Sequence, residues 1–257
     1  MFVLKLVLVC VVLIQCDAAF VDTLPKCSII DDDCIGGVFE NSLRKIGSVG
    51  IPEINMPPID PLKVTNVTMK VLDMANIILT DGVVRGISKC RSKKFHIELE
   101  KRTGVLELIC DIVIKGSIII QGTSPALQGI FGTPTVDGAG KGKVKLEKLF
   151  LHFDFPLMPF KKDDGKVYFK VLHKNMKYKH DVEKVTFAAE KLMVGSEDIS
   201  KVVIPYLNDN FKMVLEIFGG PLFDKTTEIT TDFLKIFYEN TPADLYIVEN
   251  LNSYLIN

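Results

Sequence analysis

KGKVKLEKLFLHFDF, residues 141–155, is the stretch of this chain that constrains its fold most strongly. Apolar residues alternate with polar ones along it, which is typical of a β-strand with one buried face. One alternating set of apolar positions ends at Leu146, and a second set of the opposite parity runs from Leu149 to Phe155. The buried face therefore changes within the stretch, as it does at a β-bulge, and a bulge bends its sheet. We predict a long, bulged strand.

The surrounding sequence keeps the same two-residue period from about residue 64 to residue 194. Residues 166–180 form a second long candidate strand, in which the apolar set again changes parity between Val171 and Met176. The connection KKDDGK contains the Asp-Gly pair that is typical of a tight turn. Long, bulged strands joined by turns predict a strongly curved antiparallel sheet rather than a flat sandwich.

Helical patterns flank this sheet region on both sides. Residues 33–47 place apolar side chains at helical spacing, with acidic residues at the start and Gly47 at the exit. From Tyr206 to Phe237 a second apolar stripe recurs every three or four residues, interrupted at Gly219-Gly220-Pro221. Because proline either kinks a helix or begins a new one, we expect one long kinked helix or two nearly collinear ones.

The segment GIPEINMPPIDPL, residues 50–62, separates the first helix from the sheet and contains four prolines. Proline disfavours both a helix and a central strand, so we expect an extended strap that is anchored by its Ile and Met side chains. Neither an internal repeat nor a linker divides the chain. The predicted fold is α+β and a single domain: a short helix, a strap, a highly curved antiparallel β-sheet and a long C-terminal helix.

The start of the chain has the pattern of a secretory signal peptide. Lys5 supplies the positive charge, an unbroken apolar run covers residues 6–14, and residues 18 and 19 are alanines that suit a cleavage site. A membrane anchor is the alternative, but a spanning helix needs about 20 apolar residues and this run is shorter. We interpret residues 1–19 as a signal peptide and residues 20–257 as a secreted domain with no membrane span.

Four cysteines remain once this peptide is removed, and an oxidising compartment favours disulfides. Cys27 and Cys34 enclose only SIIDDD, so the chain keeps them close, and we predict that they are bridged. The second expected pair is Cys90 with Cys110, which flank a candidate hairpin. With a turn at residues 101–104, however, Phe95 rather than Cys90 faces Cys110, so the register does not support that pair.

Charge and motifs exclude several classes of function. The chain has 31 Lys and Arg against 32 Asp and Glu, and it lacks the basic surplus with which proteins meet nucleic-acid phosphates. Neither a GxSxG elbow nor an HExxH motif is present, and GAGKGK (residues 138–143) lacks the first glycine and the hydroxyl of a phosphate loop. We therefore expect no nucleic-acid partner and no enzymatic activity.

Metal and cofactor sites are not indicated either. The four His are scattered, and no CxxC pair accompanies them. We interpret His152, in the long strand, as an outward or structurally satisfied residue, with a polar contact in a pocket as the alternative. Asn66-Val67-Thr68 is the single N-glycosylation sequon, and alternation places Asn66 opposite the buried Val67. We expect Asn66 to be exposed and usable as a glycosylation site.

Three motifs together resemble a known family. CSIIDDDC (residues 27–34), a helix and the strap GIPEINMPPIDPL resemble the opening of the insect takeout and juvenile-hormone-binding protein family, with its Cys pair and its G-I-P-x-x-x-x-P-P-x-x-P-L strap. GTPTVDGAGKGKVKLEKLFLHFDF is similar to the family's central strand. YLNDNFKMVLEIFGGPLFDKTTEITTDFLKIFYENTPADLYI is similar to its closing helix, so the resemblance covers nearly the whole mature chain.

This resemblance implies a tubular lipid-binding fold, in which a highly curved antiparallel sheet wraps a long helix. It also implies a carrier of small apolar ligands, such as sesquiterpenoid juvenile hormone, in haemolymph. Hormone carriers in the family tend to offer a tyrosine hydroxyl from the strand that here reads HFDFPL. This chain has Phe153 and Phe155 there, so a plainer ligand such as a fatty acid is the second expectation.

We expect the ligand tunnel to lie between the long strands and the closing helix. Its predicted ligand-binding residues are Phe153, Phe155, Tyr168, Phe211, Leu215 and Phe218. Any polar contact would come from Tyr168, Tyr178 or His152. The expected protein is a monomer in extracellular, haemolymph-like fluid whose partner is a terpenoid or fatty acid. The alternative is a secreted signalling or defence protein whose core is filled and which acts through its surface.

Overall fold

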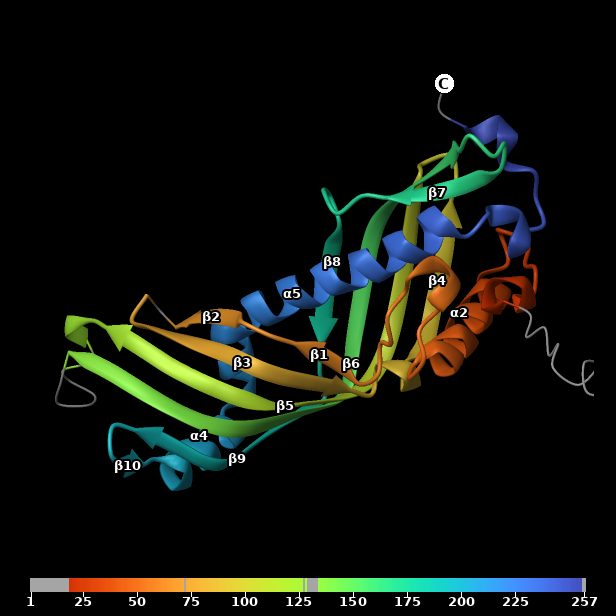
Figure 1. Cartoon of the computed structure of the whole chain (residues 1–257). Helices are drawn as coiled ribbons and strands as arrows, with labels where there is room; N and C mark the ends of the chain where they lie inside the picture. The colour runs from red at the N-terminus through yellow and green to blue at the C-terminus, as the bar shows by residue number, and fades with distance from the viewer. Residues whose placement is uncertain (1–18, 72, 127, 129–133, 256–257) are drawn as a thin grey trace, which may run out of the picture.

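The computed structural model describes residues 19–71, 73–126, 128 and 134–255. One strongly curved antiparallel sheet forms most of the structure, and a long helix crosses it (Figure 1). The strands are β1 (Leu62–Val64), β2 (Val67–Val71), β3 (Ala75–Arg85), β4 (Arg91–Glu98), β5 (Thr103–Thr123), β6 (Thr135–Lys161), β7 (Val167–Val171), β8 (Lys177–Asp181), β9 (Lys184–Val194) and β10 (Glu197–Asp198). The main α-helices are α2 (Asp32–Ile46), α4 (Ser200–Asp209) and α5 (Phe211–Asn240). Short 3-10 turns are η1 (Phe20–Thr23), η2 (Pro52–Ile54), η3 (Ile87–Lys89), η4 (Ala243–Leu245) and η5 (Leu251–Tyr254).

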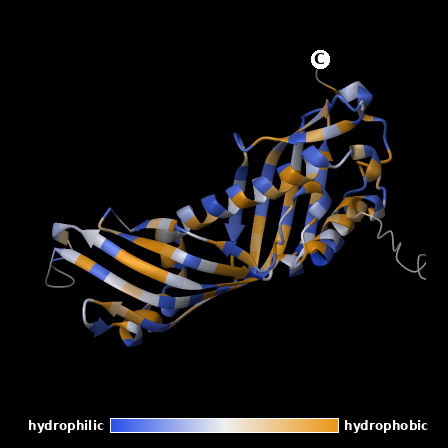
Figure 2. Ribbon diagram, in the orientation of Figure 1, coloured by the Kyte–Doolittle hydropathy of each residue, from blue (hydrophilic) through white to orange (hydrophobic). Residues whose placement is uncertain are grey.

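The two longest strands form the spine of the sheet. β5 and β6 pair antiparallel along almost their whole length, from Thr103 opposite Pro156 to Thr123 opposite Thr135. β3 and β4 pair with β5, whereas β7, β8 and β9 pair with β6. Hydrophobic and hydrophilic residues alternate along these strands, as Figure 2 shows. The predicted curved antiparallel sheet around a long C-terminal helix is confirmed.

A bulge lies where the apolar residues of β6 change parity. Cys110 is opposite Leu149 and Ile112 is opposite Leu146, so two residues of β6 face one residue of β5. Lys148 takes a positive φ of 50° there, and its N–H donates to Asp111 Oδ1 over 2.8 Å. The extra residue turns the following apolar positions to the other face, which is the bulge that the parity change predicts.

The second predicted long strand, residues 166–180, is instead two strands. β7 pairs with the end of β6, from Leu157 to Lys161, and β8 pairs with an earlier part of it. Between them the chain turns at Asn175, whose φ is 76°, and Met176 N–H donates to the carbonyl of His173. The expectation of one strand was wrong because the change of parity marks a turn here and not a bulge.

The ends of the helices lie close to the residues that the sequence signals indicate, but the break in the C-terminal helical region does not. The carboxylate of Asp31 accepts from Cys34 N–H and caps α2, and Arg44 and Lys45 occupy its last turn. α5 passes without a break through the Gly-Gly-Pro segment, with Pro221 inside it, and ends at Asn240 as predicted. The division of the C-terminal helical region lies earlier, at Asn210 between α4 and α5.

The proline-rich strap lies where its apolar side chains are buried. Ile51, Ile54, Met56 and Ile59 form a compact cluster with Ile46 of α2, and Phe233 and Phe237 of α5 pack against that cluster. The strap therefore joins α2 to α5, and its predicted anchoring by Ile and Met is confirmed. A larger apolar cluster packs between the sheet, α2 and α5.

Two disulfides join the cysteines of the described chain. Cys27 is bonded to Cys34, with Cα atoms 5.7 Å apart, and Cys90 is bonded to Cys110, with Cα atoms 4.4 Å apart. The predicted register that placed Phe95 opposite Cys110 was wrong, because Phe95 pairs with Leu106. The turn begins earlier, after Glu98, and a register shift between Ser92 and Lys94 brings the start of β4 level with Cys110.

The predicted signal peptide lies almost wholly outside the described residues and stays a prediction. Within the part of the chain that the structure describes, none of the helices has the length and apolar composition needed to cross a membrane. Asn66 is exposed between β1 and β2, and its glycosylation also stays a prediction.

The N- and C-terminal segments meet, because Cys27 N–H donates to the Tyr246 carbonyl and Val248 N–H donates to the Cys27 carbonyl.

Candidate functional site

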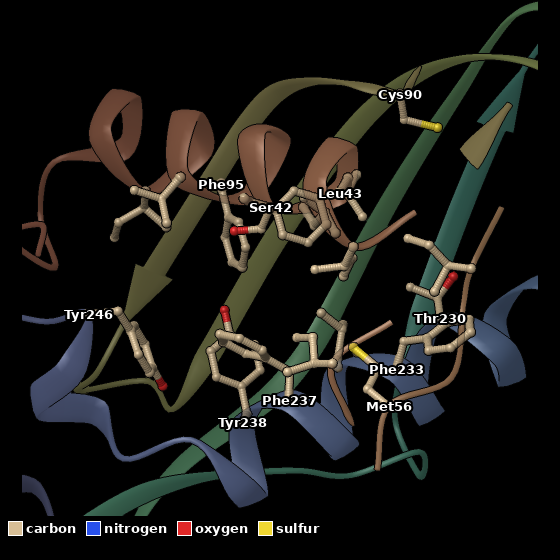
Figure 3. A pocket seen from close by; sticks show the side chains of 18 of the residues that line it. Ser42, Leu43, Met56, Cys90, Phe95, Thr230, Phe233, Phe237, Tyr238 and Tyr246 are labelled. Carbon is tan, nitrogen blue, oxygen red and sulfur yellow. The ribbon is translucent and has the colours of Figure 1, made fainter. Parts of the chain in front are cut away.

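Two apolar cavities lie against α5. Cavity 1 has a volume of about 140 Å³ and is enclosed by α2, the strap, β4, β5, the C-terminal half of α5 and the chain that follows it. Its side chains are seen in Figure 3, with α2 on one side and α5 on the other. The walls carry aliphatic and aromatic groups from segments far apart in the sequence, so the tertiary fold alone creates this space.

Cavity 2 lies further along α5, towards β1, β2 and β3, and has a volume of about 150 Å³. It is lined by the apolar faces of β5 and β6 and by α5 around Leu222 and Phe223. Five residues line both cavities: Ile87, Cys90, Leu108, Thr230 and Phe233. The two cavities are therefore neighbouring chambers along one side of α5 that share part of their walls.

Polar groups are few in the walls of both chambers. The described residues that line cavity 1 include Ser42, Thr230, Tyr238 and Tyr246 as hydroxyl groups, and no Lys, Arg, His, Asp or Glu. Cavity 2 has one charged lining residue, Lys225, whose Nζ lies 2.7 Å from Glu228 Oε1. An apolar lining of this kind suits hydrocarbon, since the aliphatic and aromatic side chains that form most of it have no hydrogen bond to water to lose.

The two tyrosines of cavity 1 are the most deeply buried ionisable groups of the site. Tyr238 is 5% exposed and Tyr246 is 7% exposed, and their ring centroids are 6.0 Å apart. Burial raises the pKa of Tyr238, and burial together with the neighbouring Tyr238 and Asp244 raises the pKa of Tyr246. Both hydroxyls therefore remain protonated at any physiological pH.

The predicted ligand-binding residues occupy different environments. Phe153 lines cavity 2. Phe155, Tyr168, Phe211 and Leu215 do not belong to the lining of either cavity. Phe155 packs against Phe95, with ring centroids 6.2 Å apart, and is 1% exposed. The side chain of Phe218 lies outside the described part of the structure.

The strand residues expected to offer polar contacts are all engaged elsewhere. Tyr168 donates to Asp164 over 2.7 Å, and burial, with that hydrogen bond, raises the pKa of Tyr168 to about 12. Tyr178 donates to Asp224 over 2.9 Å. His152 lies between Glu107 and Asp154 and lines neither cavity. This placement agrees with its interpretation as a structurally satisfied residue rather than a polar contact in a pocket.

The walls of cavity 1 include groups that sequence reasoning did not assign to a site. Val38, Phe39 and Leu43 of α2 line it, as do strap residues that had been expected only to anchor the chain. Tyr238 and Tyr246 flank the Asn240-Thr241-Pro242 exit of α5. The helical stripe could have indicated that Tyr238 is buried, but no local signal indicates that α2 faces it. Among the described residues no group of three His, Cys, Asp or Glu could hold a metal ion.

A long helix crossing a curled antiparallel sheet, with an apolar interior between them, defines a protein of the tubular α+β class. The chain belongs to the haemolymph juvenile hormone binding protein (JHBP) family, whose model matches residues 6–247. It is also similar in structure to Takeout 1 of Epiphyas postvittana, with a TM-score of 0.75, 21% sequence identity, and coverage of 87% of this chain and 99% of that chain. This second similarity shows the fold. A comparison with curated proteins found no match.

Proposed function

We propose that the chain is a secreted carrier that binds a small apolar ligand, a terpenoid or a fatty-acyl compound, in cavities 1 and 2. The observation that carries the proposal is the pair of adjoining chambers with almost wholly apolar walls along α5. Membership of a family named for juvenile hormone binding supports this type of ligand. The signal-peptide pattern and the two disulfides support secretion.

The expected affinity follows from the apolar walls. Removing apolar surface from water contributes roughly 25 cal/mol per Å², so a ligand that buries about 300 Å² gains about 7 kcal/mol before the costs of association. Micromolar or weaker binding is therefore expected from hydrocarbon contacts alone. Apolar contacts of this kind account for binding and need no catalytic group. The proposed role is therefore binding and transport.

Solvent extraction of the secreted protein, followed by mass spectrometry, tests this proposal. The protein is made in a secretory host, purified and extracted, and uptake of the fluorescent probe N-phenyl-1-naphthylamine is measured in parallel. We expect a bound apolar molecule in the extract and saturable uptake of the probe by the stripped protein. A folded protein that yields no ligand and takes up no probe would support the alternative, an interaction protein with a closed core.

A pair of variants locates the uptake. Thr230→Phe places a ring where the two chambers adjoin. The substitution removes one side-chain hydrogen bond, which Thr230 donates to the Thr226 carbonyl one helical turn earlier. Val202→Phe makes a matched increase in size on α4, where the side chain is 76% exposed. We expect Thr230→Phe to lose most of the uptake and Val202→Phe to retain it. Equal uptake by both variants would place binding outside the two chambers.

A further inference from the structure

We propose that cavity 1 has a polar end, formed by the hydroxyls of Tyr238 and Ser42, that binds an uncharged oxygen atom of the ligand. The inference rests on the proposed function and narrows the ligand class. It assigns an apolar molecule that carries an ester, ketone, ether or alcohol oxygen, held with that oxygen towards α2 and the end of α5.

The two hydroxyls lie on opposite walls of the cavity. Ser42 comes from α2 and Tyr238 from the last turn of α5, and both hydroxyls point into the space between these helices (Figure 3). Neither has a hydrogen-bond partner among the residues that the structure describes. A hydroxyl in an apolar cavity loses free energy unless a partner satisfies it, so this end of the cavity favours a ligand with an acceptor.

The other hydroxyls of cavity 1 are not available in the same way. Thr230 Oγ1 donates to the carbonyl of Thr226 within α5, over 2.8 Å. The Tyr246 hydroxyl is enclosed by protein atoms and has no partner there. Tyr238 and Ser42 are therefore the groups that can reach a ligand oxygen directly.

The charges around the cavities decide which oxygen fits. None of the described residues lining cavity 1 is a cation, so an ionised carboxylate placed there would be buried without a counter-charge, at a high cost in free energy. Burial raises the pKa of Tyr238, which keeps its hydroxyl neutral and able to donate. The one charged residue that lines cavity 2 is Lys225, and its ammonium already pairs with Glu228. Cavity 1 thus selects a neutral oxygen.

Competition for N-phenyl-1-naphthylamine by three molecules of matched chain length tests this inference: hexadecane, methyl palmitate and palmitic acid. We expect Tyr238→Phe to weaken the binding of methyl palmitate by roughly 3- to 10-fold, the effect of one hydrogen bond, and to leave hexadecane unchanged. Ser42→Ala should likewise weaken the binding of methyl palmitate and leave that of hexadecane unchanged. Tyr168→Phe is the matched control, because it removes a buried hydroxyl that donates to Asp164 outside both cavities.

Each outcome bears on a separate statement. If Tyr238→Phe and Ser42→Ala weaken ester and hydrocarbon equally, or weaken neither, the polar end is refuted while the proposed function stands. If the parent protein takes up neither the probe nor any competitor, the proposed function itself fails. If Tyr238→Phe weakens the binding of palmitic acid as much as that of methyl palmitate, the acid also binds at the polar end and the selection for a neutral oxygen is wrong. Circular dichroism shows whether each variant folds, and Ser42→Ala on α2 gives the comparison should Tyr238→Phe not fold.

Discussion

The ring of Phe155 lies directly over Gly104, so that a methyl group on Gly104 would be 2.4 Å from Phe155 Cζ. The two residues are opposite each other in β6 and β5, and Phe155 also contacts the ring of Phe95. Phe155 is 1% exposed and has no free space on its Gly104 side. The aromatic residue that the sequence suggested as a ligand contact is therefore part of the packed core.

Gly104→Ala is expected to lower the free energy of unfolding by about 1–3 kcal/mol, because the added methyl group displaces an enclosed ring. Gly37→Ala on α2 is the control, since no neighbouring atom lies within 4 Å of the added group. There the substitution should raise stability by up to about 1 kcal/mol through helix propensity. Urea denaturation measures both. A Gly104→Ala protein as stable as its parent would show that Phe155 can move aside.

Asp111→Ala is expected to destabilise the bend of the sheet. The substitution removes the acceptor of the Lys148 N–H, which Asp111 holds at 2.8 Å where Lys148 takes a positive φ. We expect a loss of about 1 kcal/mol in the free energy of unfolding. Asp163→Ala, in the exposed turn before β7, should change stability much less. Equal effects of the two substitutions would argue against a structural role for Asp111.

The bulge at Asp111 illustrates which features of this fold a sequence can reveal. It shifts the parity of the apolar residues of β6 between Leu146 and Leu149, and that change is visible in the chain itself. The change in residues 166–180 has the same appearance but marks a turn at Asn175. Periodicity records that the buried face changes, but it does not distinguish an extra residue from a break between strands.

The walls of cavity 1 could not be predicted, because they depend on contacts between distant segments. Helical spacing indicates that α2 has an apolar face, but not that this face lies opposite Tyr238 of α5. The approach of the two helices depends on the strap and on the pairing of Cys27 with the chain around Ile247. The register of β4 was missed for a related reason, since its turn and its shift between Ser92 and Lys94 leave no local pattern.

Tyr246→Phe is expected to raise the free energy of unfolding by about 1 kcal/mol. The Tyr246 hydroxyl is buried without a partner, so its removal ends a desolvation cost and breaks no hydrogen bond. Tyr168→Phe removes the same atom from a buried ring but breaks the hydrogen bond to Asp164, and it should lower stability. Thermal denaturation of both variants measures the difference. A loss of stability in Tyr246→Phe would mean that its hydroxyl is satisfied.

Glu249 should make the stability of the joined termini depend on pH. Burial raises the pKa of Glu249, but hydrogen bonds from Ser28 and from Ile29 N–H outweigh it and lower the pKa below 4.5 overall. Because the folded-state pKa is the lower one, this stabilisation is present above about 4.5 and is lost as pH falls through the folded value. Glu249→Gln should be less stable than the parent near neutral pH, and the difference should shrink in acid. A constant difference in denaturation experiments would exclude this role.

Occupation of the chambers along α5 is tested most directly by a single tryptophan at Phe233. The chain contains no Trp, and Phe233 lines both cavities, so Phe233→Trp supplies one emitter at their boundary. Methyl dibromostearate quenches tryptophan only at contact, and Tyr206→Trp on α4, where Tyr206 is 54% exposed, provides the control emitter. We predict saturable quenching in Phe233→Trp and none in Tyr206→Trp. Equal quenching in both, or none in a folded Phe233→Trp protein, would contradict binding in these chambers.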